Sequence, residues 1–95
     1  MDATNYEIRK ALVSLAVEDV LSNISDVVFE EVTRRLHKNY KCYIPDCFDN
    51  PQYLKKVLQE LYGYSHNTIV ESITNKLNEF SRQREISSFL KVICN

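Results

Sequence analysis

The chain has only one glycine and two prolines among its 95 residues. The tight turns of an all-β sandwich or barrel rely on glycine, proline and short polar residues at fixed positions. This chain has too few glycines and prolines to form the many turns that such a fold needs. A helical bundle of this length needs far fewer tight turns. The sequence therefore predicts an all-α fold, arranged as a compact four- to five-helix bundle.

Length and composition predict a single domain over residues 1–95. A chain of this length has the usual size of one domain. Its 44% hydrophobic and 26% charged residues are ordinary globular values, and its net charge of −1 creates no overall field toward nucleic acid or an anionic membrane. We expect the domain to consist of a core over 5–80 and a C-terminal amphipathic helical segment over 81–94.

The expected location is cytoplasmic. The chain opens on Met1-Asp2, without the basic and then apolar order of a secretory signal. The uncharged stretch over 11–17 is far shorter than the roughly 20 residues that span a bilayer. Three cysteines, an odd number, fit reduced thiols better than a disulfide framework.

Two helices are predicted in the N-terminal part of the chain. The first covers about 5–21 and is expected to be largely buried, because its apolar residues recur at helical spacing over a wide stripe. Ser25 is expected to cap the second, which runs to about Asn39. The two predicted stripes consist of Ile8, Leu12, Val13, Leu15, Ala16, Val17, Val20 and Leu21, and of Val28, Phe29, Val32, Leu36 and Tyr40.

Two further helices follow an ordered loop at 41–49, which has a proline and no periodicity. Asn50, followed by proline, predicts the start of the third helix, since asparagine caps helices and proline is tolerated in the first turn. Gly63 predicts its end in a left-handed conformation. The fourth helix is expected to be capped by Ser65 or Thr68. It is expected to bury Ile69, Ile73, Leu77 and Phe80.

The last segment repeats the helical spacing on a different face. If one helix continued unbroken past Phe80, the C-terminal stripe would lie about 200° around from the preceding one. One helix cannot bury both stripes in the same core, so either the chain bends near Ser81 and folds back, or the second stripe packs on a partner or a second copy. The candidate partner-binding residues are Ile86, Phe89, Leu90 and Ile93.

No catalytic arrangement is predicted. A chain with one glycine cannot build a glycine-rich phosphate loop. Ser65, His66 and Asn67 have no identifiable acid to orient them, and their residue types suit the entry to a helix. We therefore expect no enzyme activity, no cofactor and no small-molecule substrate.

A metal site is also not expected. His37, Cys42 and Cys47, with Cys94 or Asp46, could in principle surround a zinc ion, but the short Cys-x-x-Cys spacings typical of structural zinc sites are absent. A Cys42–Cys47 disulfide would matter only in an oxidising cytosol. Buried, reduced cysteines are the simpler expectation.

The densest positive charge lies near the end of the second helix. Basic residues interleaved with aromatic ones suit phosphate contact and base stacking. Cations there also suit the negative end of the helix dipole, tyrosines commonly seal a bundle end, and Asp46 and Asp49 are close in sequence. The candidate nucleic-acid-binding residues are Arg34, Arg35, Lys38 and Lys41, with His37, Tyr40 and Tyr43 between them.

Several short sequence features between residues 11 and 80 occur in a characteristic order. They are Ala11-Leu12, the spacing of Phe29, Leu36 and Tyr40, the Asp49-Asn50-Pro51 turn with Leu54 and Leu58, the Leu61-Tyr62-Gly63 stop, and Ile69, Ile73 and Leu77. This pattern resembles the archaeal family called the Nitrososphaera output domain. The resemblance implies a compact helical module, alone or attached to sensory and regulatory domains, that passes on a signal through contact. It implies no catalytic residues, and only Asn50, Pro51 and Gly63 are carried over, as structural positions.

Two functional hypotheses follow. The leading one is a small interaction or regulatory module that acts by protein–protein binding, with a protein partner or a second copy of itself and with no membrane contact. The alternative is a nucleic-acid-associated protein, or an accessory subunit of a DNA- or RNA-handling complex, that contacts phosphates through the basic residues of the second helix.

Overall fold

Helices make up almost all of the backbone in the computed structural model, which describes residues 3–94. Within these residues there are five α-helices and three short 3-10 helices, and no strand, so the predicted all-α bundle is confirmed. In chain order they are α1 (Ala3–Ile24), α2 (Asp26–Tyr40), η1 (Ile44–Phe48), α3 (Pro51–Tyr62), η2 (Gly63–Ser65), α4 (His66–Lys76), η3 (Asn78–Phe80) and α5 (Arg84–Cys94).

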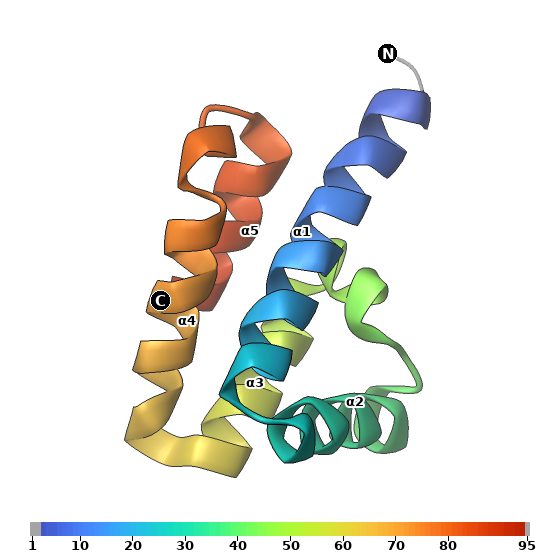
Figure 1. Ribbon diagram of the computed structural model, residues 1–95. Helices are drawn as coiled ribbons and strands as arrows, with labels where there is room; N and C mark the ends of the chain where they lie inside the picture. The colour runs from blue at the N-terminus through green and yellow to red at the C-terminus, as the bar shows by residue number, and fades with distance from the viewer. Residues whose placement is uncertain (1–2, 95) are drawn as a thin grey trace.

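Helix α1 is the central element, and it contacts α2, η1, α4 and α5 (Figure 1). Helices α4 and α5 lie side by side along one flank of the molecule, whereas α2 runs across its other end. Helix α3 packs against α2 and α5. The Cα radius of gyration is 12.4 Å, close to the value of about 13 Å expected for a folded domain of about 100 residues.

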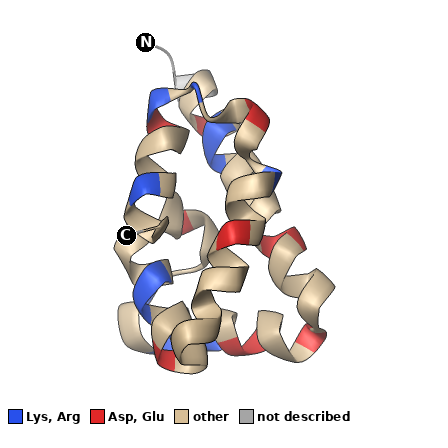
Figure 2. Ribbon diagram, turned by 90° about the vertical axis from the view of Figure 1, so that its left-hand side faces the viewer, with Lys and Arg blue, Asp and Glu red and all other residues tan. Residues whose placement is uncertain are grey.

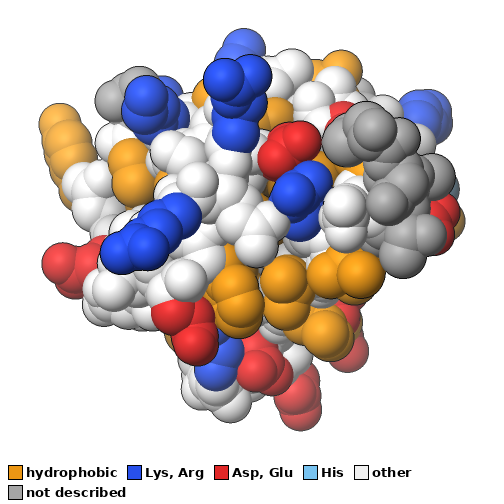
Figure 3. Space-filling model, turned by 90° about the horizontal axis from the view of Figure 1, so that it is seen from above, with side chains coloured by type: hydrophobic (Ala, Val, Ile, Leu, Met, Phe, Trp, Pro, Cys, Tyr) orange, Lys and Arg blue, Asp and Glu red, His pale blue; other side chains and the backbone are white. Residues whose placement is uncertain are grey.

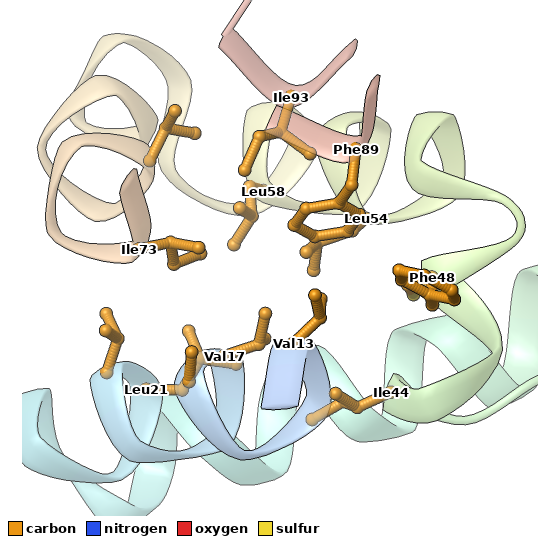
Figure 4. Packing of buried hydrophobic residues seen from close by; sticks show 14 of the residues in the cluster. Val13, Val17, Leu21, Ile44, Phe48, Leu54, Leu58, Ile73, Phe89 and Ile93 are labelled. Atoms are coloured by element: carbon orange, nitrogen blue, oxygen red, sulfur yellow. The ribbon is translucent and has the colours of Figure 1, made fainter. Parts of the chain in front are cut away.

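The core lies between α1 and the layer made by α3, α4 and α5 (Figure 4). Val13, Val17 and Leu21 point from α1 toward Leu58 and the other labelled side chains of that layer. Helix η1 closes one end of the core. The fully buried side chains include Leu21, Leu36, Leu54, Leu58, Ile73, Leu77, Ile86, Phe89 and Ile93.

Several predicted helix ends are confirmed. The Ser25 hydroxyl accepts a hydrogen bond from the backbone N–H of Val28 at 3.0 Å, as an N-cap does. Helix α2 ends one residue later than expected and is followed by Lys41 at φ 55°, whose N–H donates to the carbonyl of His37. The predicted stop at Gly63 is confirmed in its position and in its positive φ of 54°, which favours glycine, but its ψ of −130° lies outside the left-handed helical region that was expected.

Two predicted side-chain caps are wrong. Asn50 precedes α3, but its side-chain amide donates to the Asp46 carbonyl at 3.3 Å and caps no N–H of the helix. Ser65 precedes α4 without a side-chain cap, because η2 leads directly into that helix and Ser65 itself has helical backbone angles. In both places a preceding 3-10 turn sets the helix entry, so the cap is not needed.

The burial predicted for α1 is only partly correct. Val13, Val17 and Leu21 are buried, but Ile8 is 52% exposed and Leu15 is 63% exposed. The apolar stripe of this helix is wider than the face that α2, η1, α4 and α5 cover. Part of the predicted core stripe is therefore surface.

Of the two arrangements predicted for the C-terminal segment, the chain adopts the one in which it bends after the fourth helix and folds back. Helix α4 ends at Lys76, η3 and the turn after it reverse the chain, and α5 packs against α3, α4 and α1. The proposed partner-binding role of the C-terminal stripe is corrected, because these side chains fill the core and offer no surface to a partner. Their exposed fractions are 0% for Ile86, 1% for Phe89, 7% for Leu90 and 1% for Ile93.

The buried face of α5 therefore extends the core beyond the predicted bound at residue 80. Among the residues that the structure describes, no helix combines the length and apolar character needed to cross a membrane.

Candidate functional site

An open depression with a largely apolar lining lies between α1 and η1. Ile8, Ala11 and Leu15 recur every three to four residues, which places them on one outer face of α1. Ala11 and Leu15 line an open hollow of about 560 Å³ whose opposite wall is Pro45 of η1, and Ile8 lies on the same helix face just outside this lining. We call the surface made by these four residues the α1–η1 surface. The residues lining the hollow are Glu7, Lys10, Ala11, Ser14, Leu15, Glu18 and Pro45.

A buried layer beneath the α1–η1 surface fixes η1 in place. Ile44 and Phe48 of η1 are 4% and 7% exposed, and the ring of Phe48 lies 5.7 Å from that of Tyr6. The carboxylate of Asp46 accepts the backbone N–H of Tyr43 at 2.9 Å, which closes the first turn of η1. The wall that carries Pro45 is thus part of the folded core.

Asp49 joins the two walls electrostatically. Its carboxylate accepts a hydrogen bond from the Tyr6 hydroxyl and lies 3.8 Å from the ammonium of Lys10. The hydrogen bond to Asp49 raises the pKa of Tyr6 above its usual range, since the protonated phenol is the donor. Lys10 is therefore already engaged within the chain.

Two carboxylates border the α1–η1 surface. Glu7 and Glu18 line the hollow, and neither side-chain carboxylate has a hydrogen bond or an ion pair with another residue in the described part of the chain. Since Lys10 pairs with Asp49, the charge that this rim offers to a ligand is negative. Seen from above, hydrophobic side chains gather at the surface of the molecule among acidic and basic ones (Figure 3).

The predicted basic residues of α2 lie together, but acidic groups share their surface. A small hollow of about 140 Å³ is lined by Arg34, Arg35 and Lys38 together with Glu31 and Leu61. Acidic and basic positions are both spread over the helices (Figure 2). The net positive charge of the patch is correspondingly small.

Ion pairing reduces this charge further. The guanidinium of Arg35 lies 3.3 Å from the carboxylate of Glu60 on α3. The carboxylate of Glu31 accepts the Tyr62 hydroxyl at 3.3 Å, and burial together with Glu31 raises the pKa of Tyr62. Lys41 is exposed beyond the end of the helix.

The aromatic residues of this region have different roles. Tyr40 stacks on Tyr53 with ring centroids 4.3 Å apart, so it seals the junction of α2 and α3. Tyr43 is 56% exposed, and its ring lies 5.2 Å from that of His37. Only the second pair offers an open aromatic face beside the basic residues.

The cysteines are free thiols in two environments. Cys42 and Cys47 are buried together, and burial raises the pKa of both thiols, most strongly that of Cys47. Cys94 is exposed, with its sulfur 3.4 Å from the Thr74 hydroxyl oxygen. Within residues 3–94, no three His, Cys, Asp or Glu side chains are arranged so that they could hold a metal ion.

His66 takes part in the helix connection. Its Nδ1 lies 2.8 Å from the carbonyl oxygen of Gly63, so the ring closes the turn between α3 and α4. Ser65 and Asn67 beside it are exposed. The structure brings no carboxylate to this imidazole among the contacts of the described residues.

The sequence pattern did not reveal the α1–η1 surface, because Ile8 and Leu15 were both expected in the core. The helical spacing of these residues did contain a signal for an exposed apolar face. At about 100° per residue, Ile8 and Leu15 point away from Val13 and Val17, and one helix face cannot hold all four. The contribution of Pro45 carried no such sign, since it depends on the fold of η1.

Comparison with known proteins gives no relative: no family model, no curated protein and no solved structure matches the chain. The likeness to the Nitrososphaera output domain therefore rests on the sequence pattern alone.

Proposed function

We propose that this chain is a small helical interaction module that acts by binding another protein and has no catalytic activity. The observation that carries the proposal is the exposure of Ile8 and Leu15, 52% and 63%, on one face of a helix whose other face fills the core. Apolar side chains that gather at a surface, unlike single scattered ones, are typical of binding sites.

The build of the α1–η1 surface supports this function. Its two walls are held by buried residues and by the contacts of Asp49, so little ordering is needed on binding. A few apolar anchors at the centre of such a surface supply most of the affinity in helix-in-groove complexes. Such a module would act in the cytoplasm, where its three free thiols stay reduced. A regulatory role in an archaeal protein is the part that the family resemblance adds.

Site-specific photocrosslinking tests the proposal. A benzophenone amino acid at position 15 should give one discrete adduct in the native cell, whereas the same group at position 64 should give none, although Tyr64 is 94% exposed. The crosslinked protein, once identified and purified, should bind the wild-type chain and not a Leu15→Asp variant. Absence of a discrete adduct at position 15 would contradict the proposal.

The alternative function is contact with nucleic acid through α2. It is favoured by one observation: Arg34, Lys38 and Lys41 are exposed in the same stretch of chain as the exposed ring of Tyr43. The acidic neighbours Glu31 and Glu60 weaken it. Its test is the salt dependence of binding to a single-stranded oligonucleotide, whose slope should fall by about one for each phosphate-contacting base replaced with alanine. Binding that does not change in an Arg34, Lys38 and Lys41 triple alanine variant would exclude it.

A further inference from the structure

We infer that the occupant of the α1–η1 surface is an amphipathic helix of a partner protein that carries basic residues near both of its ends. This inference rests on the proposed function and specifies the chemistry of the partner. The shape of the apolar centre, the charges of the rim and the ion pairs of the bases of α1 support it.

The apolar centre has the shape that a helix side chain fits. Ala11 lies between the larger residues Ile8 and Leu15 on the outer face of α1, so the middle of the face is low. Pro45 borders this low place on the η1 side. A large apolar side chain of a partner helix can occupy it as a knob occupies a hole, with further anchors one turn before and after.

The rim selects a basic partner. Glu7 and Glu18 are 11 residues apart, so they lie about 16 Å apart along the axis of α1 and differ by only about 20° around it. Both carboxylates therefore flank the same side of the apolar centre, one near each end. A partner helix with lysine or arginine about three turns apart can pair with both, whereas an acidic helix would be repelled.

A second copy of the chain that packs its α1 against this α1 offers no base at these places. The bases of α1 are engaged within their own molecule: Arg9 lies 3.5 Å from Glu85, and Lys10 lies 3.8 Å from Asp49. If two copies paired antiparallel with Ile8 opposite Leu15, Glu18 would meet Asn5 of the other copy. A parallel pair would place each Glu7 opposite its equivalent. Self-association through α1 thus leaves the rim carboxylates uncompensated.

Two designed peptides test the inference. Both are helical, fluorescein-labelled and have leucines at i, i+4, i+7 and i+11, with four lysines flanking the stripe in one peptide and four glutamates in the other. Fluorescence anisotropy should show that the wild-type chain binds the basic peptide at least about tenfold more tightly than the acidic one. Leu15→Asp should weaken binding of the basic peptide by about tenfold or more.

Charge reversal provides the decisive variant. A Glu7→Lys, Glu18→Lys double variant should bind the acidic peptide more tightly than the basic one. Glu71→Lys, Glu79→Lys is the matched control, since it changes the net charge equally on exposed residues of α4 and η3 and should keep the preference of the wild type. Equal binding of both peptides, an unchanged preference after reversal at positions 7 and 18, or no binding at all would overturn the inference.

The two proposals can fail separately. An identified partner crosslinked at position 15 together with no peptide preference would retain the interaction function and reject the basic helix. Light scattering that shows a wild-type dimer, dissociated by Leu15→Asp, would identify a second copy as the occupant and also overturn this inference.

Discussion

Arg9 of α1 and Glu85 of α5 form an ion pair, with Nη1 and Oε1 3.5 Å apart. The same guanidinium donates through Nε to the side-chain carbonyl of Gln83, so one residue of the first helix holds the chain where α5 begins. Both partners of the ion pair are partly exposed, and such a pair contributes at most about 1 kcal/mol. The burial of α5 beneath it must therefore supply most of the stability of the reversed segment.

Phe89→Ala should strongly destabilise the fold. Phe89 is 1% exposed and lies in the core, so its truncation should lower the free energy of unfolding by about 3–5 kcal/mol. That is a large part of the about 5–15 kcal/mol available to a small domain. Urea denaturation followed by circular dichroism measures the loss. Tyr64→Ala is the control, because Tyr64 is 94% exposed. A loss below about 1 kcal/mol, combined with a smaller solution mass, would instead place α5 at an interface.

Gly63→Ala should cost about 1–3 kcal/mol of stability through backbone strain alone. Gly63 has φ 54° and ψ −130°, and an added Cβ would have no heavy atom within 4 Å. Gly63→Asn should not recover the loss, since asparagine tolerates the left-handed helical region but not this value of ψ. The same denaturation experiment checks both variants. An alanine variant as stable as the wild type would show that the turn between α3 and α4 adopts another conformation.

The three thiols should react at two different rates. Cys94 is exposed, whereas Cys42 and Cys47 are buried with raised pKa values. One equivalent of thiol should therefore be alkylated quickly and two at least about tenfold more slowly, since the buried pair must wait for opening of the fold. Iodoacetamide labelling with peptide mass mapping identifies the fast site, and labelling in denaturant should abolish the difference. Fast reaction of Cys47 in the native chain would argue against the packing of η1.

Stability should fall above pH 9 because of Cys47. In the unfolded chain this thiol ionises near its ordinary pKa of 9.0, while burial keeps it protonated in the folded chain. The unfolded state thus releases a proton that the folded state retains, and the free energy of unfolding should fall by about 1.4 kcal/mol between pH 8 and pH 10 from this group. In Cys47→Ala the fall should be smaller by that amount. An identical fall in both proteins would show that the thiol ionises freely in the folded state.

The outer face of α1 shows where sequence patterns reached their limit. Periodicity identified the apolar residues of this helix, but it does not say how much of the circumference neighbouring helices will cover. Leu15 and Val17 are both apolar and near in sequence, yet one is 63% exposed and the other 1%. Helix geometry places them on opposite faces, but only the positions of α2, η1, α4 and α5 around α1 decide which of the two is buried.

The sequence by itself determined the all-α class, the cap at Ser25 and the positive φ at Gly63, because these depend on local chemistry and on the scarcity of turn residues. It also limited the chain after Phe80 to two alternatives, a bend or an exposed stripe, since two apolar stripes about 200° apart cannot be buried in one core by one straight helix. Only the tertiary structure shows which alternative occurs: the chain turns before α5, and Phe89 is buried. The same packing left Ile8 and Leu15 outside, because core burial depends on contacts between residues far apart in the chain, which local patterns do not encode.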